Sequence, residues 1–166
     1  NTATWSTADA IDGGDGVDIF HIVQTAAIAG SPTGATVSNF ETVNITSGAG
    51  VVLNTVTSAA GFTGLVDLTT NSVGATTLTT ATTTAVNATG PLTAAALIIA
   101  GGSDVTATLN GVTTGGTTTA IGTATTAGAI VVNVNEINTT AAAGSTLAVT
   151  GGTTQTVNST QTAGIS

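Results

Sequence analysis

Short apolar clusters recur along the chain at the close and regular spacing of short β-strands. Turn-forming dipeptides lie between them, including Gly90-Pro91, Gly101-Gly102, Asn110-Gly111, Gly115-Gly116 and Gly151-Gly152. β-Branched residues dominate the clusters, and this combination predicts regular short strands. The expected strand centres are residues 43–45, 51–53, 65–68, 78, 86, 97–99, 105–109, 121, 130–134, 147–149 and 157.

Two all-β architectures have short strands at this spacing. One is a parallel β-solenoid, or β-roll, with one coil roughly every 20 to 25 residues, and the other is an antiparallel β-sandwich of about 8 to 10 strands. A sandwich core is about 10 Å thick and usually contains several aromatic side chains. Here the aromatic residues are Trp5, Phe20, Phe40 and Phe62, so the core after residue 62 must be aliphatic and thin. The sequence therefore favours the solenoid and keeps the sandwich as the alternative.

Composition predicts a single domain over residues 1–166 and argues against several functions. The chain holds 41 Thr, 28 Ala and 22 Gly, has no Cys, Lys or Arg, and has a net charge of −8. Without basic side chains it has no ordinary means of binding nucleic acid. Its apolar runs are too short for a membrane-spanning helix. The absence of an initiating Met and of a signal sequence predicts a mature or internal piece of a longer product.

The sharpest motif is GGDGVDIFH at residues 13–21, which fits the calcium-binding nonapeptide G-G-x-G-x-D-x-U-x at every specified position. Asp9 and Ile11 lie one nonapeptide before Asp18 and Phe20, so residues 4–12 form a degenerate preceding copy. Carboxylate and carbonyl oxygens are the ligands that Ca²⁺ prefers. The predicted metal ligands are Asp9, Asp12, Gly14, Asp15, Gly16 and Asp18 within a calcium-binding segment at residues 4–21. The alternative is a solvated acidic loop that binds nothing.

A roll built from nonapeptides would place equivalent turns two repeats apart, because each repeat forms half a coil. Asp9 and Asp18 would then lie on opposite edges, and the completing positions near Ala27 and Thr36 carry no acid. We therefore expect incomplete calcium sites that oxygens from a neighbouring subunit complete.

The nonapeptide resembles the repeat-in-toxin calcium rolls of type I secreted bacterial proteins. The stretches VSNFETVNIT at 37–46 and VNEINTTAAAGSTLAVTGGTTQTVNST at 134–160 resemble the Thr, Ala and Gly-rich body of Gram-negative surface-layer proteins. The resemblance implies an extracellular, calcium-stabilised solenoid that assembles into a sheet or fibre.

Catalytic chemistry has little support in the sequence. His21 is the only histidine and should face outward, because it follows the inward Phe20. Glu41 and Glu136 could form a carboxylate pair, but their similar contexts, FETVNIT and NEINTT, indicate repeat positions. We therefore expect no enzymatic activity, no catalytic residues and no organic cofactor.

The expected function is structural: a secreted subunit that associates with itself into a polymer or lattice. The alternative is a binding module, either an adhesin segment or an ice-binding solenoid, which the T-x-T triplets would suit. Sequons at Asn44, Asn87, Asn138 and Asn158 leave covalent glycans open. The C-terminal stretch 150–166 has no charged side chain, and we expect it to form an edge that accepts a neighbouring strand.

Overall fold

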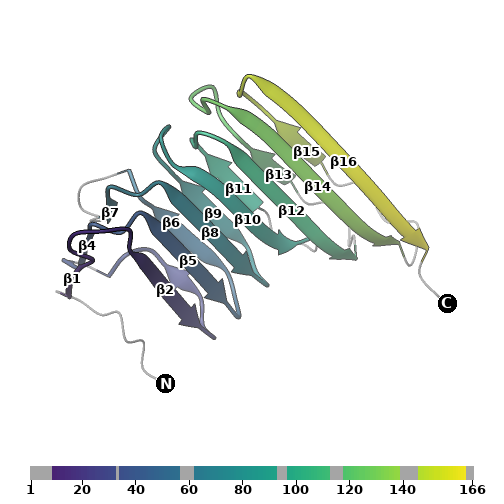
Figure 1. Ribbon diagram of the computed structural model, residues 1–166. Coiled ribbons are helices and arrows are strands. Elements are labelled where there is room, and N and C mark those ends of the chain that lie inside the picture. The colour runs from purple at the N-terminus through teal and green to yellow at the C-terminus, as the bar shows by residue number, and fades with distance from the viewer. Residues whose placement is uncertain are drawn as a thin grey trace.

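The computed structural model describes residues 9–32, 34–56, 62–92, 97–112, 118–138 and 146–163. All sixteen strands belong to parallel sheets, and no helix occurs in these ranges. Strands that are neighbours in a sheet come from successive coils of the chain, so the fold is a parallel β-solenoid (Figure 1). The solenoid prediction is confirmed, and the antiparallel sandwich is wrong for the described residues.

The largest sheet has seven strands and runs the whole length of the solenoid. Its order is β16-β14-β12-β10-β8-β5-β2. The strands are β2 (Ile19–Gln24), β5 (Thr42–Ser47), β8 (Asp67–Ser72), β10 (Ala85–Pro91), β12 (Val105–Val112), β14 (Ala129–Asn138) and β16 (Thr154–Ala163).

A six-stranded sheet lies across the core from it, in the order β15-β13-β11-β9-β6-β3. Its strands are β3 (Ile28–Ala29), β6 (Val51–Asn54), β9 (Thr76–Thr79), β11 (Leu97–Ala100), β13 (Thr118–Ile121) and β15 (Thr146–Val149). Among the described residues, a three-stranded sheet, β1-β4-β7, forms a third side at the N-terminal end only. Its strands are β1 (Ala10–Asp12), β4 (Thr36–Ser38) and β7 (Phe62–Thr63).

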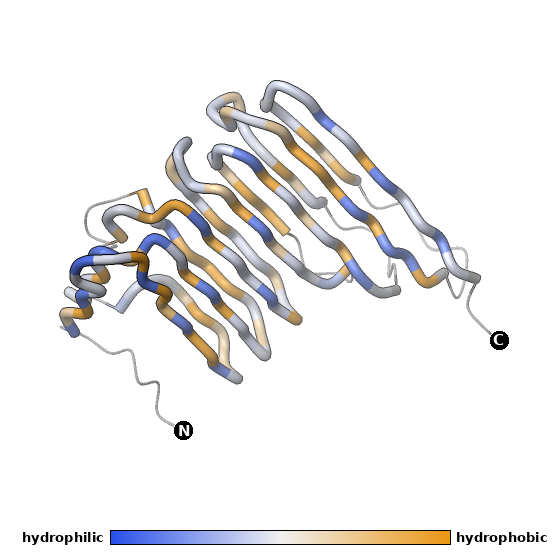
Figure 2. Tube along the Cα trace, in the orientation of Figure 1, coloured by the Kyte–Doolittle hydropathy of each residue, from blue (hydrophilic) through white to orange (hydrophobic). Residues whose placement is uncertain are grey.

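The core follows from strict alternation along each strand. In β8 every second residue is buried, and apolar and polar positions alternate along the strands (Figure 2). Parallel pairing then stacks the inward residues of successive coils into columns. We call one of these the Ile22 column, and it consists of Ile22, Ile45, Thr70, Ala88, Ala107, Val132 and Val157. A second inward column, on the six-stranded sheet, consists of Leu53, Leu78, Ile99, Ile121 and Val149.

Coil length varies along the solenoid. Asp67 pairs with Thr42 of the preceding coil and with Ala85 of the following one, so the coil that starts at Asp67 is clearly the shorter of the two. The shortening coincides with the end of the three-stranded sheet at β7, because the next coil turns directly from β9 into β10. The number of sheets alone does not set coil length, because farther along the chain Val105 pairs with Ile130, a separation equal to that between Thr42 and Asp67, in a coil whose described strands belong to two sheets only.

Of the five predicted turns named above, two lie at corners, two lie within strands and one falls outside the described residues. Gly101-Gly102 and Gly151-Gly152 follow β11 and β15, whereas Gly90-Pro91 ends β10 and Asn110-Gly111 lies within β12. Gly90 is an inward position that faces Leu97 of the six-stranded sheet, so its small size serves packing between sheets. Gly115-Gly116 lies outside the described residues.

Candidate functional site

The N-terminal loop, residues 13–18, joins β1 to β2 at one corner of the solenoid. In the next coil the same corner, between β4 and β5, needs only residues 39–41. The N-terminal loop is thus longer than the loop stacked beside it and protrudes. Gly14, Asp15, Gly16 and Val17 are all exposed.

Asp12 anchors the start of this loop. Its Oδ1 accepts hydrogen bonds from the Gly14 amide at 3.1 Å and from Asn39 Nδ2 at 2.7 Å. The bond from the Asn39 amide, and next the Gly14 bond, lower the pKa of Asp12 below its ordinary value. Asn39 itself has a positive φ of 56°, a conformation that Asn tolerates better than most residues. One side chain therefore ties two consecutive coils together.

Asp18 ends the loop and stacks beside Glu41 of the next coil. The Asp18 amide donates a hydrogen bond to Glu41 Oε2 at 2.8 Å. A Cβ atom added to Gly13 would lie 2.9 Å from Asp18 Cβ and would overlap the Asn39 carbonyl oxygen. Only glycine at position 13 therefore allows the loop to pack closely against this corner.

The free oxygen of Asp18 is the most unusual feature of the corner. Asp18 Oδ2 is buried and has no hydrogen-bond partner. A buried carboxylate oxygen without a donor is costly, because the charge loses its hydration and gains nothing in return. The chain has no Lys or Arg to neutralise this carboxylate or the neighbouring Glu41. Protonation, solvent or a metal cation must balance the charge.

The carboxylate oxygens at this corner fit part of a calcium site. Asp18 Oδ2 is a hard oxygen that accepts no hydrogen bond, and Glu41 contributes a second carboxylate from the adjacent coil. Within the described residues, however, no three Asp, Glu or His side chains are close enough to hold an ion. Further oxygens would have to come from loop carbonyls, water or another subunit.

The other predicted ligands are not all gathered here. Gly14, Asp15, Gly16 and Asp18 belong to the N-terminal loop, with Asp15 exposed, and Asp12 ends β1 directly before it. Asp9 lies before β1, where its carbonyl oxygen accepts a hydrogen bond from the Thr36 amide. Because β1 separates Asp9 from the N-terminal loop, Asp9 lies about 10 Å from the loop. Residues 4–8 of the predicted calcium-binding segment lie outside the described residues.

The expected spacing of two nonapeptides per coil is wrong at this end of the molecule. Ile19 pairs with Thr42, and Ala10 pairs with Thr36. Measured from either strand, the first coil is therefore longer than two nonapeptides. The residue stacked beside Asp18 is therefore Glu41, not Ala27 or Thr36. Sequence reasoning missed Glu41 because the third side of the coil adds residues that the nonapeptide spacing does not contain.

Glu41 and Glu136 are not equivalent positions. Glu41 precedes the first residue of β5, whereas Glu136 lies near the last residue of β14. Because β5 and β14 are parallel, the two residues lie at opposite ends of the strands of the seven-stranded sheet. Gln161 Nε2 donates to Glu136 Oε2 at 3.4 Å. The two carboxylates do not face each other, and the prediction that they mark one repeat position is wrong. His21 is exposed, as expected.

The outer face of the seven-stranded sheet carries short amide ladders. Asn135 Nδ2 donates to Asn110 Oδ1 at 2.8 Å, and Asn158 Nδ2 donates to Asn133 Oδ1 at 2.9 Å. Along this face the residues in register mix amide, hydroxyl and aliphatic side chains: His21, Asn44, Thr69, Asn87, Thr106, Val131 and Thr156. The face is therefore polar, but it is not a uniform threonine array.

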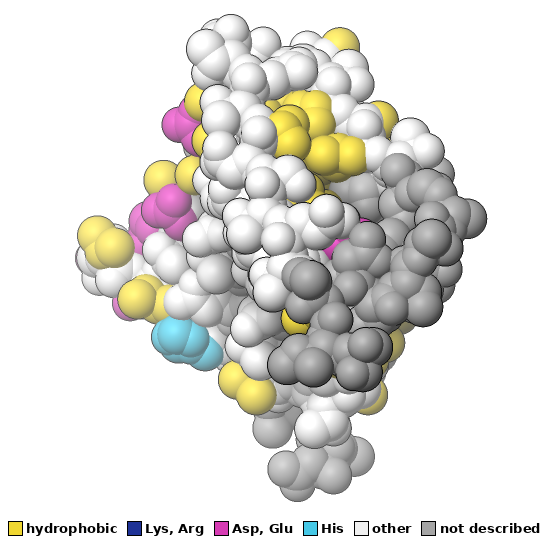
Figure 3. Space-filling model, turned by 90° about the vertical axis from the view of Figure 1, so that its right-hand side faces the viewer, with side chains coloured by type: hydrophobic (Ala, Val, Ile, Leu, Met, Phe, Trp, Pro, Cys, Tyr) yellow, Lys and Arg dark blue, Asp and Glu magenta, His cyan; other side chains and the backbone are white. Residues whose placement is uncertain are grey.

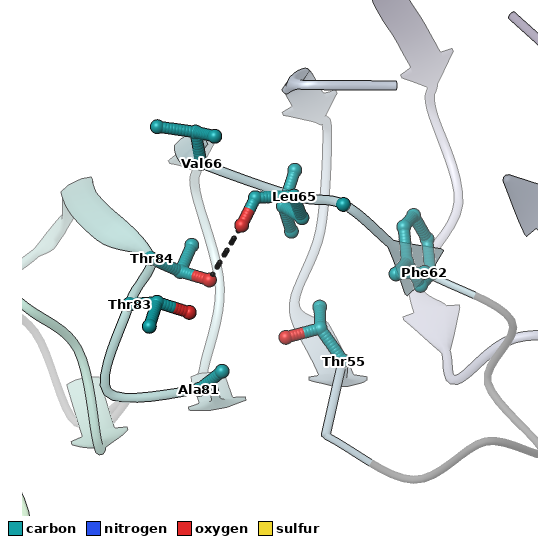
Figure 4. Close-up of a pocket in the computed structure, with 8 residues that line it drawn as sticks. Thr55, Phe62, Leu65, Val66, Ala81, Thr83 and Thr84 are labelled. Atoms are coloured by element: carbon teal, nitrogen blue, oxygen red, sulfur yellow. Dashed lines mark hydrogen bonds between the residues drawn. The ribbon is translucent and has the colours of Figure 1, made fainter. Parts of the chain in front are cut away.

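A cavity of about 230 Å³ lies beside β7, where the three-stranded sheet ends (Figure 4). Thr84 Oγ1 donates to the Leu65 carbonyl oxygen at 3.0 Å at its wall. None of the lining residues is titratable, so they provide no acid, base or charged metal ligand. They are Thr55, Phe62, Gly64, Leu65, Val66, Ala81, Thr83 and Thr84.

Comparison with known proteins gives no family for this chain. No family model matches it, and no curated protein or solved structure matches it either. The part of the chain that the structure describes contains no helix suited to crossing a membrane.

Proposed function

We propose that this protein is a secreted structural subunit that associates with itself through its solenoid ends and is stabilised by calcium. The observation that carries the proposal is the state of β16. Every described side chain from Thr154 to Thr162 is exposed, and the strand contains no charged residue and no Pro. Natural edge strands usually carry such residues, because they prevent pairing with another chain. A long unprotected edge of this kind is suited to accepting a neighbour.

Surface chemistry supports a structural role outside the cell. The outer face of the seven-stranded sheet presents amides and hydroxyls, and the chain has no Lys or Arg at which trypsin could cleave. The resemblance of the N-terminal nonapeptide to secreted calcium rolls points in the same direction. The proposed subunit has no enzymatic activity, and its glycosylation at the sequons is a separate question.

An adhesin or ice-binding module is the second candidate. The polar outer face with its amide ladders favours it, since stacked hydrogen-bonding groups suit a repetitive ligand. A module of this kind works as a monomer, so its state in solution separates the two candidates.

Calcium enters the proposal at the corner of Asp18 and Glu41. The buried Asp18 Oδ2 lacks a donor, and a bound cation would offset the cost of burying it. A ligand that binds only the folded state stabilises it by about 2.7 kcal/mol at a hundredfold excess over Kd. Calcium should therefore raise Tm, and EGTA should reverse the effect.

Sedimentation velocity in millimolar calcium and in EGTA tests the function directly. We expect assemblies larger than a monomer in calcium. The Glu41→Gln variant should lose most of the calcium-dependent rise in Tm, whereas Glu136→Gln, which removes the same charge far from the corner, should keep it. A monomer at every protein concentration would refute the structural proposal, and an unchanged Tm in EGTA after demetallation would refute the calcium part.

A further inference from the structure

The coil that starts at Asp67 has no strand on the third side of the solenoid. Between β6 and β8 the chain forms β7, whereas between β9 and β10 it has only residues 80–84. The Thr84 amide donates to the Ala81 carbonyl oxygen at 3.1 Å within this turn. On one side β7 pairs with β4, and no described strand pairs with it on the other. The three-stranded sheet therefore ends in an open edge between two described coils.

The cavity beside β7 lies at this open edge. Phe62 and Leu65 form one wall and are only 8% and 7% exposed, while Thr55 and Ala81 lie across from them (Figure 4). Val66 also lines the cavity and is 49% exposed. An apolar cavity of about 150 Å³ is large enough for benzene. This one, at about 230 Å³, can therefore hold an aliphatic side chain.

A second hollow, of about 150 Å³, lies on the outer face of the seven-stranded sheet, and we call it the acidic hollow. Asp67 pairs with Ala85, and Asp104 directly precedes Val105 of the next strand. The small Ala85 thus lies between two exposed aspartates whose Cα atoms are about 10 Å apart. Hydroxyl and amide side chains complete the lining: Thr69, Asn87 and Thr106.

Asp104 is held in place by the following coil. Its Oδ1 accepts a hydrogen bond from the Ala129 amide at 2.7 Å, and a Cβ atom added to Gly128 would overlap this oxygen. The carboxylate is therefore fixed before any ligand arrives, which lowers the entropic cost of binding to it.

The cavity and the acidic hollow lie on either side of one ridge. Val66 lines the cavity and the next residue, Asp67, lines the acidic hollow; Thr84 and Ala85 do the same one coil farther on. The Ala85 amide donates to the Val66 carbonyl oxygen at 2.7 Å and holds the two coils together at the ridge. One extended ligand can therefore reach an apolar and an acidic subsite at once.

We propose that these two subsites bind an extended segment of another protein that carries one aliphatic side chain and, a few residues away, one Lys or Arg. The aliphatic side chain enters the cavity, the backbone pairs with the open edge of β7, and the cation lies between Asp67 and Asp104. Strand addition of this kind gains affinity from main-chain hydrogen bonds and specificity from side-chain pockets.

Charge identifies the partner as a different protein. The chain has eight acidic residues and no Lys or Arg, so a second copy has no such cation to supply. Most of the acidic side chains visible in Figure 3 lie along one side of the molecule. Carboxylates on both sides of a hollow attract a cationic side chain and repel an anionic one. A metal ion would occupy the acidic hollow alone, whereas a segment with both groups uses the whole site.

Synthetic peptides test the two subsites together. Acetylated and amidated Gly/Thr peptides, each with one Leu and one Lys at spacings of one to four residues, are titrated into the wild-type protein by calorimetry at low ionic strength. We expect the best spacing to bind at least about tenfold more tightly than matched peptides with Ala for Leu or Gln for Lys. Equal binding of all peptides, or binding of none, would overturn the inference.

Two pairs of variants locate the contact. Ala81→Leu should fill the cavity and weaken binding of the best peptide at least about tenfold, whereas Ala124→Leu, at the exposed corner between β13 and β14, should leave it unchanged. Asp67→Asn should reduce binding to the level of the Gln peptide. Glu136→Gln removes the same charge near the last residue of β14 and should keep full binding.

Calcium separates this site from a simple cation site. Millimolar Ca²⁺ should weaken the Lys contribution at most and leave the Leu contribution in place, because the cavity has no titratable residue. Binding that depends on Lys and Asp67 but on neither Leu nor Ala81 would overturn the two-part ligand. The proposed self-association is measured by sedimentation without peptide, so it stands or fails independently.

Discussion

The two ends of the solenoid share one backbone ladder but differ in their chemistry. The N-terminal end has a third sheet, a protruding acidic loop and a covered Ile22, whereas the C-terminal end has two sheets, no charged residue in β15 or β16, and an exposed Val157. The comparison teaches that parallel pairing keeps successive coils in register but fixes neither the number of sheets that a coil contributes to nor the chemistry of its corners.

Glycines at the two ends should respond very differently to the same substitution. Gly14 and Gly151 both have positive φ, at 84° and 81°, but a Cβ at Gly14 would meet nothing, whereas a Cβ at Gly151 would overlap the Thr123 carbonyl oxygen. We expect Gly151→Ala to lower the free energy of unfolding by about 3 kcal/mol or more, and Gly14→Ala by about 1 kcal/mol. Urea denaturation measures both, and equal losses would mean that the corners of the C-terminal coils are as open as the N-terminal loop.

The Ile22 column offers a smaller but cleaner contrast. Val132→Ala removes fully buried methyl groups and should cost about 2 kcal/mol, whereas Val157→Ala should cost less than about 0.5 kcal/mol in the monomer. The measurement is urea denaturation at a concentration at which the protein is monomeric. A large loss in the monomer would mean that Val157 is already covered.

The smallest effect concerns the pH dependence of the N-terminal loop. The bond from Asn39 lowers the pKa of Asp12, so the charged form favours the folded state. This contribution is present above the unfolded pKa and is lost as pH falls through the lower folded pKa. In an NMR titration, Asn39→Ala should raise the Asp12 midpoint toward the ordinary value, whereas Asn135→Ala at the other end should leave it unchanged. A midpoint that does not respond to Asn39→Ala would contradict this cause.

The solenoid was predictable because its signal is local and repeated. Apolar residues such as Leu78 and Ile99 recur at strand spacing, and glycines at positions 101, 102, 151 and 152 mark the corners. Gly90 and Gly111 misled the turn prediction, because both lie within strands: Gly90 packs against Leu97 between the sheets, and Gly111 has a positive φ of 124° inside β12. Coil length at the N-terminal end was harder still, since there it includes the strands β1, β4 and β7, whose pairing joins residues far apart in the sequence.

The candidate site was only half predictable. The nonapeptide identified Asp12, Asp18 and the loop glycines from sequence alone. Glu41 required the register between β2 and β5, which places it beside Asp18 at a spacing that no repeat indicates.

The ladder bonds between coils also determine how the solenoid would bear mechanical load. Backbone hydrogen bonds between parallel strands run along the solenoid axis, so a pull along this axis stretches them directly. Ten residue pairs join β14 to β16, whereas six join β10 to β12 and only two join β11 to β13 on the opposite side. Among the described residues, the coil boundary between β10–β11 and β12–β13 is the least reinforced. A filament of these subunits under tension would then yield inside the subunit at that boundary, before the longer β14–β16 ladder opens.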